Sequence, residues 1–587
     1  MWGIYVGAMY WFLNGALLRG ELDSWKGGDL QFSKARSWFP GYVVIDDFDI
    51  RHQDPNVEWT AKLKSVRAFL NVFGLLWGEF RFSGISADDG SFRFRLKSRD
   101  SSACVPEDIS FPRELEINKK KDGGEPWRFS FSDIQITNFN DIWFDCYRFV
   151  GKGGVSGGFR LFGGDGAVIE EGTLSFEEGK VLRPTQGLWV ESFSGVVVGD
   201  IKRFYDKSAT HEIFSGMSGR IVLKGQGLEL GTLNYVLNSA PQVVLEKGVA
   251  AFDSNISYVD GVLNAGSTAE VQSSRATVKL GKFEVGSGLE MKMEVKEAPS
   301  FVLKLTDYSV GQPKAILSGD QALIRLQGKS KDITRGMPNL TGSIEVKNAS
   351  VDNLEELNRL IPKVSPFQIV SGSGNLDLFF SSEGKQETAQ LEVNLAPIRV
   401  RYKDLIHQGR LNLALPAKGP IFSELNFKSP LARAEFELTE EGKERLPLKG
   451  AVSLTKADLD FEKKKYSSRF RVSLPQSELL QKIVSDEAGV PSWILDVSTD
   501  KQADAHGMIR MSEGKLELTK VWLESGSLNI RGGLCKTDPD SNGAFLIWAG
   551  PAAVAIEFLG KQTNFRLQDA PGWYKQNYPG ETGICPD

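Results

Sequence analysis

Apolar and polar side chains alternate along most of this chain, and this alternation limits the folds that it can adopt. From about residue 28 onward it is interrupted about every 8 to 12 residues by Gly, Pro, Asn, Asp or Ser, as in strands joined by turns. Residues two apart on a strand share a face, so each run predicts a strand with one apolar and one charged face. Antiparallel sheets with one solvated face have this pattern, whereas parallel α/β strands are continuously apolar.

The predicted strands number roughly 30, with about 5 to 8 residues each, which is too many for one ordinary sandwich or barrel. They form either several separate β domains or one continuous sheet, which would extend ~140 Å at ~4.8 Å per strand. No composition shift marks a boundary, and the glycine-rich stretch 151–166 is either a break or a hairpin. The absence of clear boundaries favours one elongated sheet.

Four short helices are expected between the strands. Residues 352–361 carry apolar side chains at helical spacing, with Asp352 as the cap and Pro362 as the stop. Ser477 is positioned to cap a second helix at 477–485, and residues 66–77 and 201–214 are further candidates.

The first 18 residues are almost wholly apolar, with Asn14 as their only clearly polar side chain. A helix of this length spans ~27 Å, which just matches a hydrocarbon core. No Lys or Arg precedes Arg19 and no clear small-x-small site follows. An uncleaved anchor is therefore favoured over a cleaved signal peptide or a buried helix, and it would place the remaining chain on one side of a membrane. The expected anchor residues are Trp2, Ile4, Tyr5, Val6, Tyr10, Trp11, Phe12, Leu13, Leu17 and Leu18.

The sequence offers no recognisable catalytic or metal-binding motif. Its four histidines form no H-E-x-x-H pattern, and neither G-x-S-x-G nor a Walker loop occurs. Adjacent carboxylates such as Asp88 and Asp89 point to opposite faces of a strand, so they do not form a glycosidase pair. The net charge of −5 is well mixed, which disfavours nucleic-acid binding. We expect no enzyme activity, metal, cofactor or nucleic-acid partner.

The four cysteines lack metal-ligand spacing. Cys104 and Cys146 either form a disulfide in an oxidising compartment or remain thiols.

The repeated apolar face is the main functional candidate, and it has two interpretations. It is either a core filled by the other half of the sheet, or a concave surface that stays partly open and binds acyl chains. On the second interpretation the lipid-binding candidates are Phe92, Phe94, Leu96, Leu376, Leu378, Phe380, Leu391, Val393, Leu395, Leu411, Leu413, Leu415, Phe436, Phe470, Val472, Leu516, Leu518, Leu528, Ile530, Val554, Ile556 and Phe558.

Three segments carry a resemblance to a known family. They are the aromatic strands and apolar segment at 27–96, the unit VDNLEELNRLIPKVSPFQIVSGSGNLDLFF at 351–380, and GKLELTKVWLESGSLNIRGG at 514–533. This order of features resembles the AsmA-like proteins of Gram-negative envelopes, TamB among them, and more distantly the chorein-type bridge-like lipid-transfer proteins. The resemblance implies a groove-shaped sheet that is anchored in the inner membrane and extends across the periplasm.

Together these features predict a mostly β fold: a transmembrane helix followed by an elongated, curved antiparallel sheet with a few short helices. The expected divisions are an anchor at 1–19, an amino-terminal β region at 27–150, groove regions at 151–350 and 351–570, and a tail at 571–587. The resemblance implies phospholipid transfer toward the outer membrane, with membrane lipids and other envelope proteins at the carboxyl-terminal end as partners. A non-catalytic assembly factor with a filled core and a β-helix enzyme acting on envelope polysaccharide are the alternatives.

Overall fold

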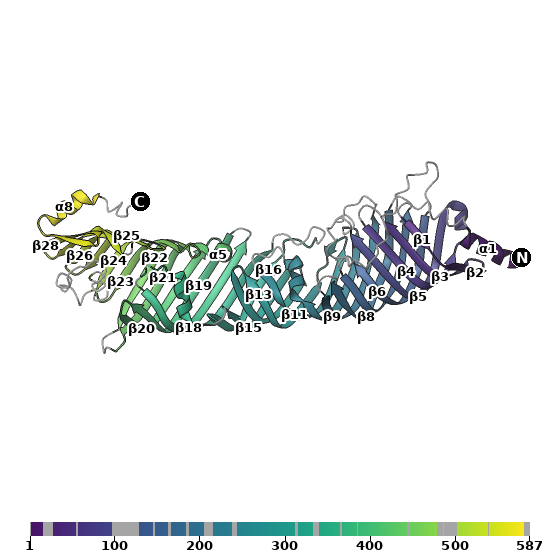
Figure 1. Cartoon of the computed structure of the whole chain (residues 1–587), viewed down its shortest axis with the longest axis horizontal. Helices are drawn as coiled ribbons and strands as arrows, with labels where there is room; N and C mark the ends of the chain where they lie inside the picture. Colours follow the sequence, from purple (N-terminus) through teal and green to yellow (C-terminus); the bar gives the residue numbers. More distant parts are fainter. Residues whose placement is uncertain are drawn as a thin grey trace.

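A single sheet of 29 strands runs through the computed structural model, from α1 (Trp2–Asn14) at one end to α8 (Ala570–Asn577) at the other (Figure 1). This confirms the predicted mostly β fold with one elongated, curved sheet and few helices. The structure describes residues 2–15, 28–53, 57–96, 128–144, 147–162, 166–183, 187–204, 215–237, 243–311, 315–332, 340–363, 365, 367–383, 386–442, 447–477, 485, 502–537 and 539–579.

Strands that follow one another in the sequence pair antiparallel over almost the whole sheet. The first two strands both pair with the third, and the fifth and sixth pair in parallel. The strands up to the middle of the chain are β1 (Gly28–Gln31), β2 (Lys34–Phe39), β3 (Tyr42–Gln53), β4 (Val57–Leu70), β5 (Glu79–Leu96), β6 (Arg128–Phe144), β7 (Tyr147–Phe162), β8 (Gly166–Arg183), β9 (Gly187–Phe204), β10 (Met217–Glu229), β11 (Val243–Val259), β12 (Val262–Leu263), β13 (Thr268–Leu280), β14 (Phe283–Val295), β15 (Pro299–Val310), β16 (Leu317–Gln327) and β17 (Thr341–Val351).

The second half of the sheet continues the same meander. The glycine-rich stretch 151–166 falls in the β7–β8 hairpin rather than between separate sheets. The remaining strands are β18 (Phe367–Glu383), β19 (Gln386–Tyr402), β20 (Leu405–Lys418), β21 (Asn426–Glu440), β22 (Leu448–Asp460), β23 (Lys465–Leu474), β24 (Ala503–Ser512), β25 (Lys515–Ser525), β26 (Leu528–Thr537), β27 (Asp540–Ala549), β28 (Ala552–Gly560) and β29 (Gln562–Arg566).

Most strands are longer than the 5 to 8 residues expected, because many presumed turns are bulges inside strands. Asp133 and Asn348 have φ near +50° and lie where the register of their strand shifts. Pro397, after a cis peptide bond, lies at another such shift in β19. Left-handed bulge positions favour the same Gly, Asn and Asp residues as turns. Each bulge also bends its strand, which curves the sheet.

The sheet curls so strongly that distant hairpins meet. Lys282, between β13 and β14, forms a 2.8 Å ion pair with Glu462, between β22 and β23. Leu459 and Phe461 of that second region lie on Phe427 of β21, and all three belong to the same apolar cluster as the buried residues of β13–β17. One face of the sheet is therefore turned inward over the middle of the molecule, and we call it the inner face.

A zero-length carbodiimide reagent should link Lys282 to Glu462, because it joins only an amine and a carboxylate that are in contact. Peptide mass spectrometry of the treated full-length protein would identify the linked pair. The neighbouring-strand pair Lys292–Glu270, with a nitrogen–oxygen distance of 2.9 Å, is the positive control. Linkage of the control pair without the Lys282–Glu462 link would contradict the curled arrangement.

Short helices dock against strands through asparagine side chains that imitate a β-bridge. Asn14 of α1 donates to the carbonyl of Ala35 and accepts from its amide, at 2.7 and 3.0 Å. Asn234 makes the same pair of bonds with Leu245, and Asn358 makes it with Ile369. The other short helices are the 3-10 helices η1 (Gly74–Trp77), η3 (Leu230–Leu233) and η4 (Leu354–Leu360) and the α-helices α4 (Asn234–Leu237) and α5 (Ile421–Glu424).

The helices predicted from the sequence agree only in part with those of the structure. The segment 352–361 does contain η4, but its cap is the left-handed Asn353 rather than Asp352. The predicted helix at 66–77 is wrong over most of its length, because β4 continues to Leu70 and only η1 is helical. Residues 201–204 belong to β9, while 205–214 lie outside the described residues, as does most of 477–485.

Helix α1 lies against the edge of the sheet rather than apart from it. The Tyr5 hydroxyl is 2.7 Å from Ser37 Oγ and donates to the carbonyl of Phe39, and Leu13 is buried against the sheet. Leu17 and Leu18 lie outside the described residues. Within the described part of the chain, no helix has the length and apolar character needed to cross a membrane.

Candidate functional site

The inner face carries rows of apolar side chains that cross the strands and so follow the long axis of the molecule. Strand pairing places Leu376 opposite Val393, Val393 opposite Leu413, and Leu413 opposite Ala434. The same row continues through Val452, Val472 and Ala505. Cross-strand neighbours on one face lie about 5 Å apart, so such a row is a continuous apolar strip.

Parallel rows bring together the other candidates in this part of the sheet. Leu378 lies opposite Leu391, which lies opposite Leu415, while Leu395, Leu411 and Phe436 follow one another in a third row. Phe470 pairs with Leu454. The sequence alternation therefore identified residues that do share one face.

These rows are incompletely covered between β18 and β25. We call the half-buried inner-face residues of these strands the open stretch; from the sequence candidates it contains Leu376, Leu378, Leu391, Val393, Leu411, Leu413, Leu415, Phe436, Phe470, Val472, Leu516 and Leu518. Phe380 and Leu395 are the two candidates in these strands that are fully buried. Apolar area that remains accessible to water is the physical requirement for binding an acyl chain.

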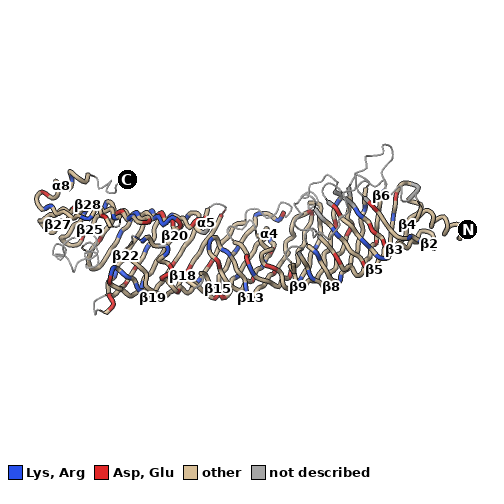
Figure 2. The backbone as a smooth tube through the Cα atoms, viewed as in Figure 1, with Lys and Arg blue, Asp and Glu red and all other residues tan. Residues whose placement is uncertain are grey.

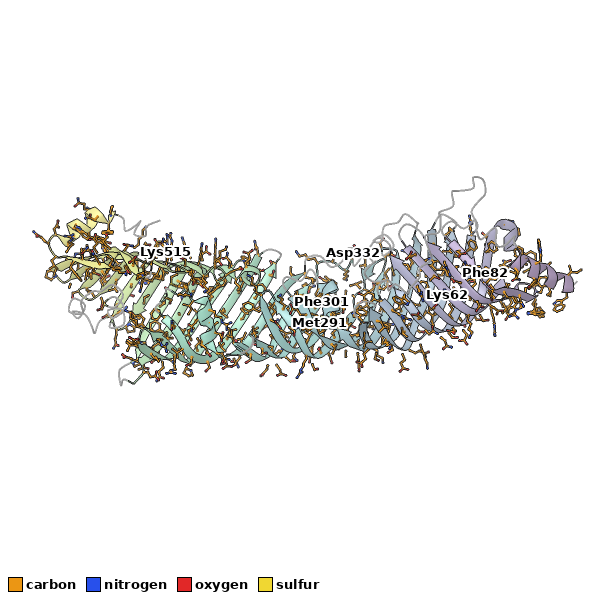
Figure 3. The ribbon with its side chains drawn as sticks, in the orientation of Figure 1. Lys62, Phe82, Met291, Phe301, Asp332 and Lys515 are labelled. Carbon is orange, nitrogen blue, oxygen red and sulfur yellow. The ribbon has the colours of Figure 1, made fainter. Side chains whose placement is uncertain are left out.

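The middle of the sheet differs, because its inner face is filled. Leu303 and Ile324 are at most 1% exposed, and Met291 and Phe301 lie in the same cluster (Figure 3). Leu230 and Leu237, from η3 and α4, are buried in this cluster too. The rows continue here, since Ile344 lies opposite Phe380, but the side chains pack on one another.

Phenylalanine side chains fill much of the amino-terminal part of the inner face. Phe131 stacks on Phe82 and Phe159 at centroid distances of 5.5 and 4.5 Å. The candidates Phe92 and Phe94 are half-buried there, and the side chain of Leu96 is outside the described residues. This region is well packed, and aromatic pairs of this kind add about 0.5–1.5 kcal/mol each to stability beyond the effect of burial.

The carboxyl-terminal end is closed on both faces of the sheet. Its inner face buries the candidates Leu528, Ile530, Val554, Ile556 and Phe558, so for these residues the filled-core interpretation is correct. On the outer face Tyr574 of α8 packs against Leu546 and Ala555. Cys535, in β26, is disulfide-bonded and buried, a bond that the spacing of the cysteines did not predict. Cys104 and Cys146 lie outside the described residues.

Lys, Arg, Asp and Glu recur along the sheet (Figure 2). Strand alternation places many of them on the outer face, opposite the apolar rows. Glu437 of β21 is flanked by Lys449 and Arg410, whose hydrogen bonds and charges hold the pKa of this carboxyl below its usual value. Exposed pairs of this kind contribute little to stability, but they keep this face in water. A row of stacked side chains also crosses β24–β26. The guanidinium of Arg531 lies 3.5 Å from the ring centroid of Trp522, and Trp522 stacks on His506.

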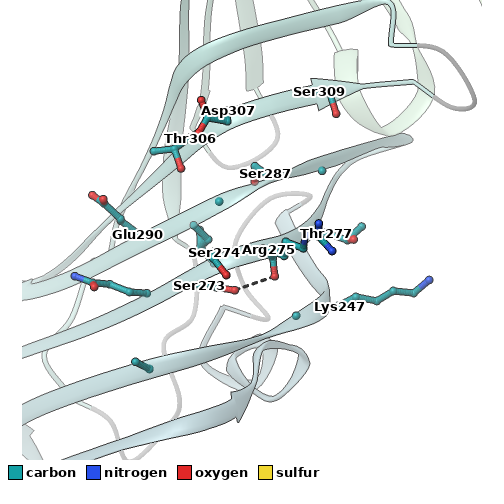
Figure 4. Close-up of a pocket in the computed structure, with 17 residues that line it drawn as sticks. Lys247, Ser273, Ser274, Arg275, Thr277, Ser287, Glu290, Thr306, Asp307 and Ser309 are labelled. Atoms are coloured by element: carbon teal, nitrogen blue, oxygen red, sulfur yellow. Dashed lines mark hydrogen bonds between the residues drawn. The ribbon is translucent and has the colours of Figure 1, made fainter.

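A polar hollow of 920 Å³ lies over β11, β13, β14 and β15 (Figure 4). It coincides with register shifts after Ser273 and Gly286, where the bulged strands separate. Ser273 Oγ donates to the carbonyl of Arg275 within it. Its lining is mostly Ser, Thr, Gly and charged residues, unlike the apolar lining of typical small-molecule sites. The described residues contain no cluster of three possible metal ligands.

Tyr308, between the lining residues Asp307 and Ser309 in the sequence, is buried in the core of the middle of the sheet. Burial, together with the charge of Asp320, raises its pKa to about 12. Because this value exceeds the ordinary 10.0, the group's contribution to stability is complete below pH 10 and is lost as the pH rises toward 12. Urea unfolding at pH 9 and at pH 11.5 should therefore show a loss of stability that is smaller in Tyr308→Phe. An equal loss in both proteins would contradict this assignment.

No protein-family model matches the sequence, and a search of curated proteins found no match.

Proposed function

We propose that this chain is a non-catalytic, envelope-membrane protein that binds phospholipid acyl chains along the open stretch of its inner face and passes lipid toward the outer membrane. The observation that carries the proposal is the half-buried apolar row from Leu376 to Val472. Covering apolar surface contributes about 25 cal/mol per Å², so an acyl chain needs no specific partner there. Its headgroup would stay in water at the edge of the sheet.

The proposed location is the periplasmic side of an inner membrane, with the amino-terminal segment as the anchor. Two observations support it. Cys535 is disulfide-bonded, and such bonds persist in oxidising compartments. The amino-terminal segment is almost free of polar side chains, in keeping with its resemblance to the anchors of AsmA-like proteins.

Lipid extraction from the full-length protein tests the proposal. The protein would be purified from membranes and its lipids analysed by mass spectrometry, followed by transfer of labelled phospholipid from donor vesicles to the delipidated protein. We expect co-purifying phospholipid and saturable uptake. Absence of both would refute the proposed function.

A second candidate function is a structural or assembly factor of the envelope. The filled middle, where Leu303 and Ile324 are buried, favours it, because a continuous conduit needs accessible apolar surface along its length. Passage of lipid through β13–β17 would require the packed walls to separate. A protein that binds lipid only between β18 and β25 and never transfers it between vesicles would fit this second function.

A further inference from the structure

Three segments without a single charged residue come together at the amino-terminal end of the molecule. They are residues 2–15, 37–45 and 68–78, in a chain in which 25% of residues are charged. The first contains α1, the second the β2–β3 turn, and the third the end of β4 with η1.

Hydrogen bonds and ring contacts hold the three segments side by side. Trp2 Nε1 donates to the carbonyl of Trp38 at 3.0 Å, and the Tyr5 hydroxyl accepts from the amide of Gly41 at 3.1 Å. The amide of Leu70 donates to the carbonyl of Gly41 at 2.7 Å. The rings of Tyr42 and Phe69 also lie 5.3 Å apart. The segments therefore form one surface.

This surface exposes large aromatic side chains to an extent not seen elsewhere in the described residues. Phe39 and Phe73 are both 70% exposed and Trp77 is 74% exposed. Every tryptophan among the strongly exposed apolar residues of the described part belongs to it. We call the set Trp2, Trp11, Trp38, Phe39, Phe69, Phe73 and Trp77 the aromatic end.

We propose that the aromatic end inserts into the interfacial layer of a phospholipid bilayer, so that the β2–β3 and β4–η1 turns form a membrane contact in addition to the amino-terminal segment. Exposed Trp and Phe on segments that carry no charged residue match this layer, where tryptophan is enriched. A solvated or protein-bound end would tolerate the Lys, Arg, Asp and Glu that cover the rest of the outer face. The inference rests on the membrane location that we propose for this chain, and it specifies which surface contacts the membrane.

Quenching of tryptophan fluorescence by brominated lipid tests the contact. Full-length protein would be reconstituted into phosphatidylethanolamine–phosphatidylglycerol vesicles whose acyl chains carry bromine close to the headgroup. We expect quenching of the wild type, and a reduction of that quenching by about half or more in the double variant Phe39→Asp with Phe73→Asp, because carboxylates would keep Trp38 and Trp77 out of the bilayer. The matched control is Phe379→Asp with Phe565→Asp, two exposed phenylalanines far along the sheet. It should quench like the wild type.

Two results would overturn the inference. One is equal quenching in the wild type and in both double variants. The other is a dimer in lipid-free solution that Phe39→Asp with Phe73→Asp dissociates, because the surface would then join two copies of the chain. Bound phospholipid measured on the same preparations separates this inference from the proposed function. If the protein retains lipid but the quenching does not depend on the turns, only the proposed membrane contact is refuted. If the quenching depends on the turns but no lipid is bound, only the proposed lipid binding along the open stretch is refuted.

Discussion

Replacing Leu413 by Asp should reduce the phospholipid bound to the protein more than tenfold. Leu413 lies at the centre of the open stretch, between Val393 and Ala434 on the neighbouring strands. A carboxylate here would face the acyl chain without a partner, at a cost above about 2 kcal/mol, and each 1.4 kcal/mol changes an affinity about tenfold. Lipid mass spectrometry of wild type and variant would measure the loss.

The adjacent position supplies a matched control for this variant. Asn412 is exposed on the opposite face of the same strand, so Asn412→Asp adds the same charge to the outer face. It should bind lipid like the wild type. Hydrogen exchange over β20 should be unchanged in both variants, which would show that the strand remains paired. Equal lipid content in Leu413→Asp and Asn412→Asp would mean that the open stretch is not where lipid binds.

Replacing Leu303 by Ala should destabilise the middle of the sheet by about 2–5 kcal/mol, which is the cost of removing a fully buried leucine side chain from a packed core. Leu303 is 0% exposed and lies between Met291 and Ile324. Because a long sheet opens locally, hydrogen exchange of peptides from β14 to β16 is the appropriate measurement.

Val302, the neighbour of Leu303 on the outer face, is the control for this second prediction. It is exposed, so Val302→Ala should change the opening free energy by only about 0.5 kcal/mol. Similar small effects of both substitutions would show that the inner face of the middle is accessible in solution. The open stretch would then extend into β13–β17, and the structural alternative to lipid transfer would lose its main support.

The alternation of side chains was sufficient to predict the sheet and the residues that share its inner face. Leu376, Val393 and Leu413 could be assigned to one face because a strand has a period of two and antiparallel pairing preserves it. The strand boundaries could not be read in the same way. Residues such as Asn348 occupy bulges inside strands, and the local chemistry of a bulge resembles that of a turn.

Exposure of the inner face could not be predicted, because it depends on contacts between distant parts of the sheet. Leu303 and Leu413 occur in similar alternating runs, yet only Leu303 is fully buried. In the sequence Asn14 stands out only as the one clearly polar residue of an apolar segment; in the structure its side chain joins α1 to β2. Its partner, the edge of β2, is defined only once the sheet has formed.

Site-specific photocrosslinking most directly tests whether lipid occupies the open stretch. Benzoylphenylalanine would replace Leu413 in one full-length protein and Asn412 in another, both expressed in cells and irradiated before purification. The proposed function predicts a phospholipid adduct, identified by mass spectrometry, at position 413 and little or none at position 412. The absence of a lipid adduct at position 413, or equal adducts at both positions, would contradict it.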